Sequence, residues 1–269
     1  MKIALPGGRS PARPWTTRSI PRWMILACSV VLFLTAWQLA STYLLNPHLF
    51  PPPTQVAAAA VPLFNSGEMA GHILASLERV FIGFVTGSLA GVIFGVLMGR
   101  LRIVSDFLEP VIQPARFLSP TAMIPIAIIW FGIGETSKYF LIFYATFFIV
   151  LINTISGVIN TPLLRIRAAQ CFGASQLQVF LEVVIPSAVP YIVSGMRIAL
   201  ASSFMAIIPA EMLAADSGLG YLLQQAGLNV QSDRIFVALA VISLIGYLSD
   251  ALFRALIGRR LYRYTELTR

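Results

Sequence analysis

The chain alternates between long apolar stretches and short polar segments. The apolar stretches are about 20 residues long, the length that a helix needs to cross the hydrocarbon core of a bilayer. Their recurrence predicts a bundle of membrane-spanning helices. We expect five uninterrupted spans, at residues 23–45, 73–98, 139–159, 191–212 and 235–257. The first is too long for the apolar region of a cleaved signal peptide, so we expect it to remain as an anchor.

Two further segments depart from this pattern. A short apolar helix at residues 54–64 follows a proline cluster, cannot span, and is expected at the outer interface. Residues 103–134 predict a sixth, discontinuous span with an amphipathic start and an apolar part at 122–131. A broken helix is tolerated at membrane depth only where protein or a water-filled cavity covers the freed backbone groups. The interruptions are Pro110, Pro114, Pro120 and Pro125.

The placement of arginine predicts the orientation. The net charge of +8 is carried by 17 Arg and two Lys. Cytoplasmic loops of membrane proteins are enriched in such residues. If the N-terminus lies in the cytoplasm, nearly all of the Arg residues that flank the spans fall on the cytoplasmic side. The prediction is an all-α integral membrane protein with six transmembrane helices and both termini cytoplasmic. It divides into a basic tail at 1–22, a transmembrane domain at 23–258 and a basic tail at 259–269.

Composition excludes several classes of protein. Only 11% of the residues are charged, whereas soluble domains have about a quarter. Nucleic-acid binding is not expected, since no folded soluble face can gather the basic residues. Cys28, Cys171, His48 and His72 are too few and too scattered for a metal site or a disulfide framework. No Lys follows a Gly, so the chain lacks a phosphate-binding loop. ATP, if used, is hydrolysed elsewhere.

A polar segment at residues 165–190 has its own local order. A first short helix is expected to stop at Gly173, which takes the left-handed conformation without steric cost. Ser175 and Gln178 match the capping box that starts a second helix, which Pro186 is expected to end. Taken alone, this pattern would also suit any helix-turn-helix loop between two spans.

The same segment resembles the cytoplasmic EAA loop of ABC-importer permeases. Ala168 and Ala169 are followed by Gly173 and then by Val183-Val-Ile-Pro186. The resemblance covers roughly residues 45 to 260 and points to the nitrate/sulfonate/taurine branch. It extends to Ser76-Leu-Glu-Arg-Val80, Trp130-Phe-Gly-Ile-Gly-Glu-Thr-Ser-Lys138, Ala210-Glu-Met212 and Gly218-Leu-Gly220. The name EAA implies Glu at the position that Arg167 occupies in this sequence. Permeases of this branch often have Arg there, so the difference weakens only the claim of a specific salt bridge from this position.

The resemblance implies the type I ABC-importer permease fold in the bacterial inner membrane. The chain would be a non-catalytic permease subunit for a small anion, with taurine or another alkanesulfonate first and nitrate or bicarbonate next. Its partners would be a cytoplasmic ATPase that holds ATP and Mg, a periplasmic substrate-binding protein and a second permease subunit, with lipid around them. The ATPase would dock on the polar segment described above, here taken as residues 162–188 and called the 162–188 loop. The coupling residues would be Arg167, Ala168, Ala169, Gly173, Ala174, Ser175, Ile185 and Pro186.

Polar and ionisable residues inside the spans are costly and need partners. Arg197 and Asp250 lie at similar depths in two spans that run in opposite directions, so we expect a structural ion pair. Glu211 near the outer end of its span is a candidate gate residue, or else it snorkels to the interface. Candidate pathway residues are Asn153, Ser202 and Ser203.

Glycine recurs every four residues along the second span. This spacing puts small residues on one stripe of the helix, where another backbone can approach closely in lipid. Packing within the chain is the preferred interpretation, and a subunit interface is the alternative. The stripe consists of Gly83, Gly87, Gly91, Gly95 and Gly99.

Two other functions stay open from the residues alone. A self-sufficient secondary transporter could use Asp250 as its intramembrane carboxylate, although no internal repeat is evident. A membrane-embedded enzyme would have to rely on Ser, Asp and Glu, whose spacing suggests no catalytic dyad.

Overall fold

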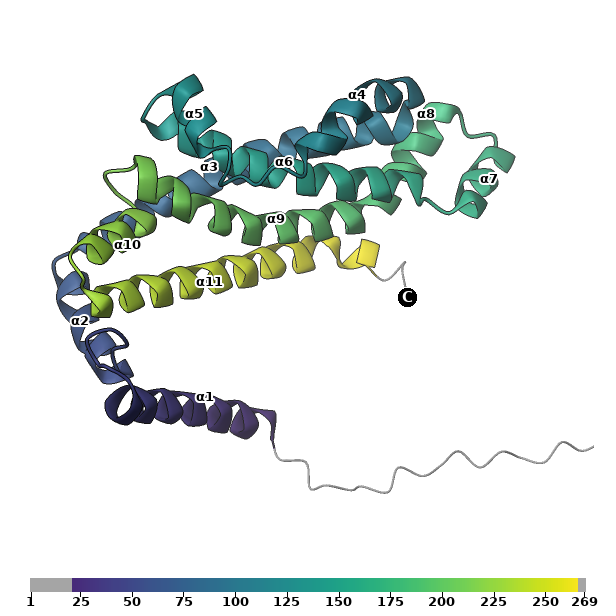
Figure 1. Cartoon of the computed structure of the whole chain (residues 1–269). Coiled ribbons are helices and arrows are strands. Elements are labelled where there is room, and N and C mark those ends of the chain that lie inside the picture. Colours follow the sequence, from purple (N-terminus) through teal and green to yellow (C-terminus); the bar gives the residue numbers. More distant parts are fainter. Residues whose placement is uncertain (1–20, 266–269) are drawn as a thin grey trace, which may run out of the picture. The chain divides into compact units, whose positions relative to one another are not determined.

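The computed structural model describes residues 21–265, with side chains for residue 21 and for residues 23–257 (Figure 1). Every regular element in this range is helical. The chain divides into two compact units, one ending at Gln55 and the other beginning at Val56. The predicted N-terminal tail lies almost wholly outside the described residues.

The first unit contains the predicted first span. Helix α1 runs over Arg22–Leu39 and continues as a π-helical segment, Ala40–Leu44. The proline-rich turn then folds back on this helix, since the Ser41 hydroxyl donates to the Phe50 carbonyl oxygen at 2.5 Å. Within its own unit, the apolar surface of α1 is almost entirely uncovered. Helix α2, Pro53–Asn65, begins at the end of this unit.

Four long helices build the second unit: α3 (Glu68–Arg100), α6 (Glu135–Ile159), α9 (Ile185–Ala214) and α11 (Ser232–Thr265). They run roughly alongside one another (Figure 1). Their mutual core contains Val80, Phe84, Ile142, Val150, Leu200, Phe204 and Ile207 from α3, α6 and α9.

The glycine stripe on α3 explains how closely α3 and α6 approach. A Cβ built on Gly83 would lie 2.5 Å from the Cβ of Ile142, and one on Gly95 would lie 2.6 Å from that of Thr154. The other three stripe glycines also face α6. The stripe therefore packs within the chain, as the preferred interpretation holds.

The expected sixth span is two helices, α4 (Arg102–Ala115) and α5 (Ile124–Phe131). Five other helical segments are long and apolar enough to cross a membrane in the described part of the chain. Pro110 and Pro114 lie inside α4 and do not interrupt it. The interruption falls at residues 116–123. Here the Tyr144 hydroxyl, from the middle of α6, donates to the Ala115 carbonyl oxygen at 2.5 Å.

Two predicted boundaries are wrong. The second helix of the 162–188 loop does not end at Pro186 but continues from Gln176 to Ala214 as α8 (Gln176–Gln178), a π-helical segment (Val179–Val184) and α9. Pro186 is the second residue of α9 and follows the π-helical segment directly, so the helical backbone continues through it. Helix α11 likewise continues to Thr265, so most of the expected C-terminal tail is helical.

Candidate functional site

The 162–188 loop forms the turn between α6 and α9 that the sequence predicts. Helix α7, Leu163–Cys171, ends just before Gly173, whose φ of 82° is left-handed. Both capping-box hydrogen bonds are present. The Ser175 N–H donates to Gln178 Oε1 at 2.8 Å, and the Gln178 N–H donates to Ser175 Oγ at 3.3 Å. The loop therefore has a defined conformation set by residues within it.

This loop presents an uncovered apolar surface. No residue of α7 is buried. Phe172 is 92% exposed, and Leu163, Leu164, Leu177 and Leu181 are exposed as well. Among the expected coupling residues, Arg167, Ala168, Gly173 and Ser175 are exposed, whereas Ala169, Ala174, Ile185 and Pro186 are partly covered. An apolar surface of this kind on a polar loop is typical of a protein-binding site.

The loop is attached to the bundle at two points. The Arg100 guanidinium, at the end of α3, stacks 4.0 Å over the Phe180 ring. The Arg165 guanidinium donates to Ser187 Oγ at 3.3 Å, which ties α7 to the start of α9. The π-helical segment is therefore in direct contact with α3, and α7 is in direct contact with the start of α9.

A buried charged cluster lies near the other end of the second unit. Its centre is Arg79 on α3, whose side chain is 5% exposed. Arg79 Nε donates to Glu135 Oε2 at 2.6 Å, and Nη2 donates to Glu135 Oε1 at 2.8 Å. Nη1 donates to Glu211 Oε1 at 2.8 Å and to the Ser217 carbonyl oxygen at 2.6 Å. We call Ser76, Arg79, Glu135, Lys138, Glu211 and Ser217 the Arg79 cluster.

Glu211 on α9 is fully buried in this cluster. Its carboxylate accepts from Arg79, from Ser76 Oγ at 2.8 and 2.9 Å, and from the Gly220 N–H at 2.9 Å. Glu211 therefore does not snorkel to an interface, and that alternative is wrong. Such a buried carboxylate is tolerated because a charged partner and several donors replace its hydration.

The turn before α10 (Leu219–Leu228) closes the cluster and requires glycine twice. Gly218 has a φ of 119°, and a Cβ there would overlap the Glu211 carboxylate. A Cβ on Gly220 would overlap the Ile208 carbonyl oxygen. The Gly218 N–H donates to His72 Nδ1 at 3.0 Å, which adds a further link to α3. The backbone at Gly218 and Gly220 is therefore in direct contact with the Glu211 side chain.

Sequence reasoning missed the roles of Arg79, Glu135 and Lys138. The Lys138 side chain is 4% exposed and donates to Glu135 Oε1 at 2.9 Å. A signal existed, because each of the four segments that carry the family resemblance outside the 162–188 loop contributes to the cluster. The structure brings all four together around one guanidinium.

Arg197 and Asp250 form the ion pair that their depths predict. Arg197 Nε donates to Asp250 Oδ1 at 2.8 Å, and Nη2 donates to Oδ2 at 3.3 Å. Arg254 approaches the same carboxylate at 3.2 Å. In contrast to Arg79 and Glu211, both Arg197 and Asp250 are partly exposed, and they line a groove of about 250 Å³ between α9 and α11.

The three candidate pathway residues lie on α6 and α9. Ser203 is fully buried and hydrogen-bonds Thr146 of α6 at 2.9 Å. Asn153 packs against Gly195 of α9 and donates to the Ile149 carbonyl oxygen at 2.8 Å. Ser202 is partly exposed. A pathway role for these residues stays a prediction.

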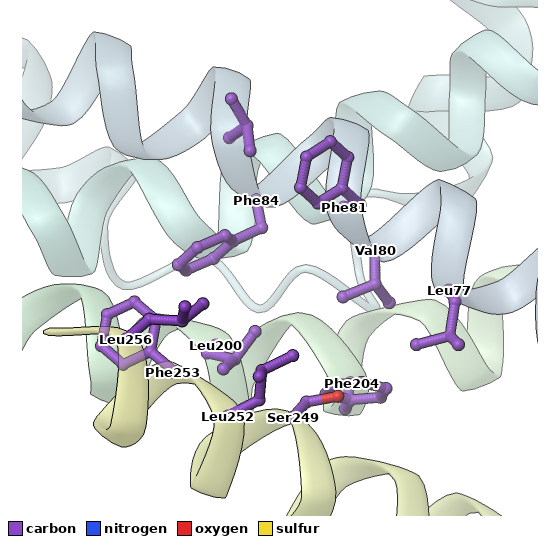
Figure 2. Close-up of a pocket in the computed structure, with 11 residues that line it drawn as sticks. Leu77, Val80, Phe81, Phe84, Leu200, Phe204, Ser249, Leu252, Phe253 and Leu256 are labelled. Atoms are coloured by element: carbon purple, nitrogen blue, oxygen red, sulfur yellow. The ribbon is translucent and has the colours of Figure 1, made fainter.

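A second groove is unsuited to an anion. It measures about 320 Å³ and lies between α3, α9 and α11, with Leu77, Phe84, Leu200, Phe204 and Phe253 among its walls (Figure 2). Ser249 supplies the hydroxyl drawn in this lining. An anion entering it would lose its hydration for almost no hydrogen bonds, which costs several kcal/mol or more. The groove suits hydrocarbon.

The outer surface of the helices is that of an integral membrane protein. Large apolar side chains are exposed along the spans, among them Phe81, Leu89, Met205 and Leu252. Soluble monomers rarely expose apolar surface on this scale. A helical bundle with this apolar exterior and several helices long and apolar enough to cross a bilayer belongs to the class of integral membrane proteins.

The comparisons identify the family. Residues 83–262 match the binding-protein-dependent transport system inner membrane component, and the chain belongs to this family of ABC-transporter permeases. It is 37% identical over 231 residues to the taurine transport system permease protein TauC of Escherichia coli, covering 84% of each chain. It is 34% identical over 240 residues to the nitrate import permease protein NrtB of Synechococcus elongatus, covering 85% of this chain and 86% of that one.

A solved structure shows the same fold. The inward-facing MetNI methionine ABC transporter superposes with a TM-score of 0.57 at 19% identity, over 72% of this chain and 97% of that one. The protein is thus a permease of the bacterial inner membrane. Permeases of its family work with an ATPase and a substrate-binding protein.

Proposed function

We propose that this permease carries a small anion across the inner membrane, driven by a separate ATPase that docks on the 162–188 loop. The observation that carries the proposal is the loop itself: a capped, exposed turn whose most prominent side chain, Phe172, is 92% exposed. ATP and Mg would bind on the ATPase, and this chain would need no cofactor of its own.

The proposed substrate is taurine or another alkanesulfonate, with nitrate or bicarbonate next. Support comes from the names of the relatives, since the taurine permease is 37% identical and the nitrate permease 34% identical to this chain. Nothing in the side chains of the permease points to one of these anions over the others. The binding protein that delivers the substrate would make that choice.

The proposed topology places both termini and the 162–188 loop in the cytoplasm. Helices α4 and α5 together would make the sixth crossing, with the break at residues 116–123 covered by protein or water rather than lipid. A second copy of the chain would complete the pathway. ATP binding would move the two loops and alternate access between the two sides of the membrane.

The test is uptake by proteoliposomes that contain the permease, its ATPase and its binding protein. We expect ATP-dependent uptake of radiolabelled taurine or an alkanesulfonate, with nitrate and bicarbonate measured in parallel. Vesicles without the ATPase are the control. Uptake that persists in them would support the secondary transporter and contradict the proposal.

A further inference from the structure

We infer that Arg79 is a positioning residue that closes the free end of the α6–loop–α9 hairpin, so that a movement of the 162–188 loop is transmitted as one rigid movement. The inference rests on the proposed function. Glu135 lies in the first turn of α6 and Glu211 in the last turn of α9. One guanidinium on α3 therefore joins the two arms of the hairpin at the end that the loop does not join.

The two ends of the hairpin lie far apart. From Glu211 to Ile185 is 26 residues of helix, about 39 Å at 1.5 Å per residue. Helices α6 and α9 pack on each other along this length, through the Thr146–Ser203 hydrogen bond and the contact of Asn153 with Gly195 among others. The Arg79 cluster adds a charged link at their far ends and joins both arms to α3, which the glycine stripe packs along α6.

The geometry of Arg79 fits a clamp and does not fit a ligand site. A guanidinium has five N–H donors. Two bond Glu135, one bonds Glu211, and two bond the carbonyl and hydroxyl oxygens of Ser217. No donor is left for an anion. The charges also balance, since Arg79 and Lys138 face two carboxylates.

The clamp also fixes the turn before α10. Ser217 is bonded by Arg79, the Leu219 N–H donates to Ser76 Oγ at 2.9 Å, and the Gly220 N–H donates to Glu211. Four segments therefore share one set of bonds. A Cβ at Gly218 or Gly220 would overlap its neighbours, so these contacts require glycine at both positions.

Arg79→Lys is the decisive variant. Lysine keeps the charge, but its single ammonium cannot reach both carboxylates and Ser217 together. Arg197→Lys is the matched control, since Arg197 also bonds a carboxylate through two nitrogens but lies outside the Arg79 cluster. Each complex is reconstituted in proteoliposomes, and its assembly, basal ATPase rate, rate stimulated by binding protein and uptake are measured.

The expected result is a loss of coupling in the assembled complex. Arg79→Lys should keep the basal ATPase rate, while the uptake per ATP hydrolysed falls about tenfold, within the usual range for a coupling free energy. Arg197→Lys should keep the uptake per ATP of wild type, because it leaves the Arg79 cluster intact. A purely structural role would lower the amount of complex but leave uptake per ATP unchanged, and this outcome would overturn the inference.

A second variant decides the case in which Arg79→Lys does not assemble. Glu135→Gln removes one carboxylate of the clamp, and the Glu135 side chain is 48% exposed, so folding should tolerate the change. Reduced uptake per ATP supports the inference, and wild-type coupling overturns it. If the wild-type complex itself shows no ATP-dependent uptake, the proposed function is wrong. The inference about Arg79 fails differently, because wild type then transports and the variants keep its uptake per ATP.

Discussion

Glu211 Oε1 lies 2.8 Å from Arg79 Nη1, although the two residues are 132 positions apart in the sequence. Both side chains are too deeply buried for water to take the place of a lost partner. In a buried pair of this kind, the loss of one partner leaves an uncompensated charge, which costs more than the pair itself contributes. This ion pair between α3 and α9 therefore requires both residues.

Glu211→Ala is expected to destabilise the permease by about 3–5 kcal/mol, because Arg79, Ser76 and the Gly220 N–H all lose an acceptor. Thermal unfolding of the detergent-solubilised protein measures the effect. Glu109→Gln, on the exposed surface of α4, is the control and should leave the melting temperature unchanged. Equal melting temperatures for both variants would contradict the buried cluster.

Gly91→Ala and Gly71→Ala make the same change on one helix with opposite expected results. A Cβ on Gly91 would lie 2.9 Å from the Phe147 carbonyl oxygen and 3.1 Å from the Leu151 nitrogen, and this backbone cannot move aside cheaply. Overpacking of this kind costs about 1–3 kcal/mol. At Gly71 nothing lies within 4 Å, so alanine should stabilise α3 by up to about 1 kcal/mol.

Thermal unfolding of the two variants beside wild type checks this prediction. A lower melting temperature for Gly91→Ala together with an unchanged or higher one for Gly71→Ala supports the packing of α3 on α6. If Gly91→Ala melts as wild type does, the two helices are not in contact at this glycine.

Local features were predictable from the sequence. The capping box of Ser175 and Gln178 depends on residues three positions apart, and the stop at Gly173 depends on one backbone conformation. The pairing of Arg197 with Asp250 followed from counting helical rise in two antiparallel spans. In each case the deciding information lies within a few residues or in one simple geometric rule.

The Arg79 cluster was not predictable in the same way. Its bonds join residues 56, 132 and 138 positions apart, so they depend on how three helices pack. The resemblance motifs contained every member of the cluster except Ser217 but gave no indication that they meet. Pro186 was misjudged for a related reason: the π-helical segment before it was not anticipated, so the proline was taken to end a helix that in fact continues through it.

Asp250→Asn is expected to destabilise the protein, but by less than the loss of one partner from a fully buried pair, because these side chains are partly exposed. The change leaves Arg197 and Arg254 facing each other without the carboxylate that both contact. Adding Arg197→Leu should restore part of the stability, since an apolar pair can replace an ion pair at little cost. The yield and melting temperature of the three proteins measure this, and an additive loss in the double variant would contradict the pair.

Gly173→Val is expected to reduce ATP-dependent uptake while leaving membrane insertion intact. A Cβ at Gly173 meets nothing within 4 Å, but its φ of 82° is strained for valine by about 1–3 kcal/mol. The strain should shift the turn between α7 and α8 and so misplace the surface around Phe172. Gly67→Val is the matched control, because Gly67 has a φ of 77°, equally open surroundings and a place outside the 162–188 loop. Uptake and co-purification of the ATPase are compared for both variants.

If Gly67→Val and Gly173→Val lose uptake equally, backbone strain alone accounts for the effect. If Gly173→Val transports as wild type does, the loop does not couple the ATPase to the permease.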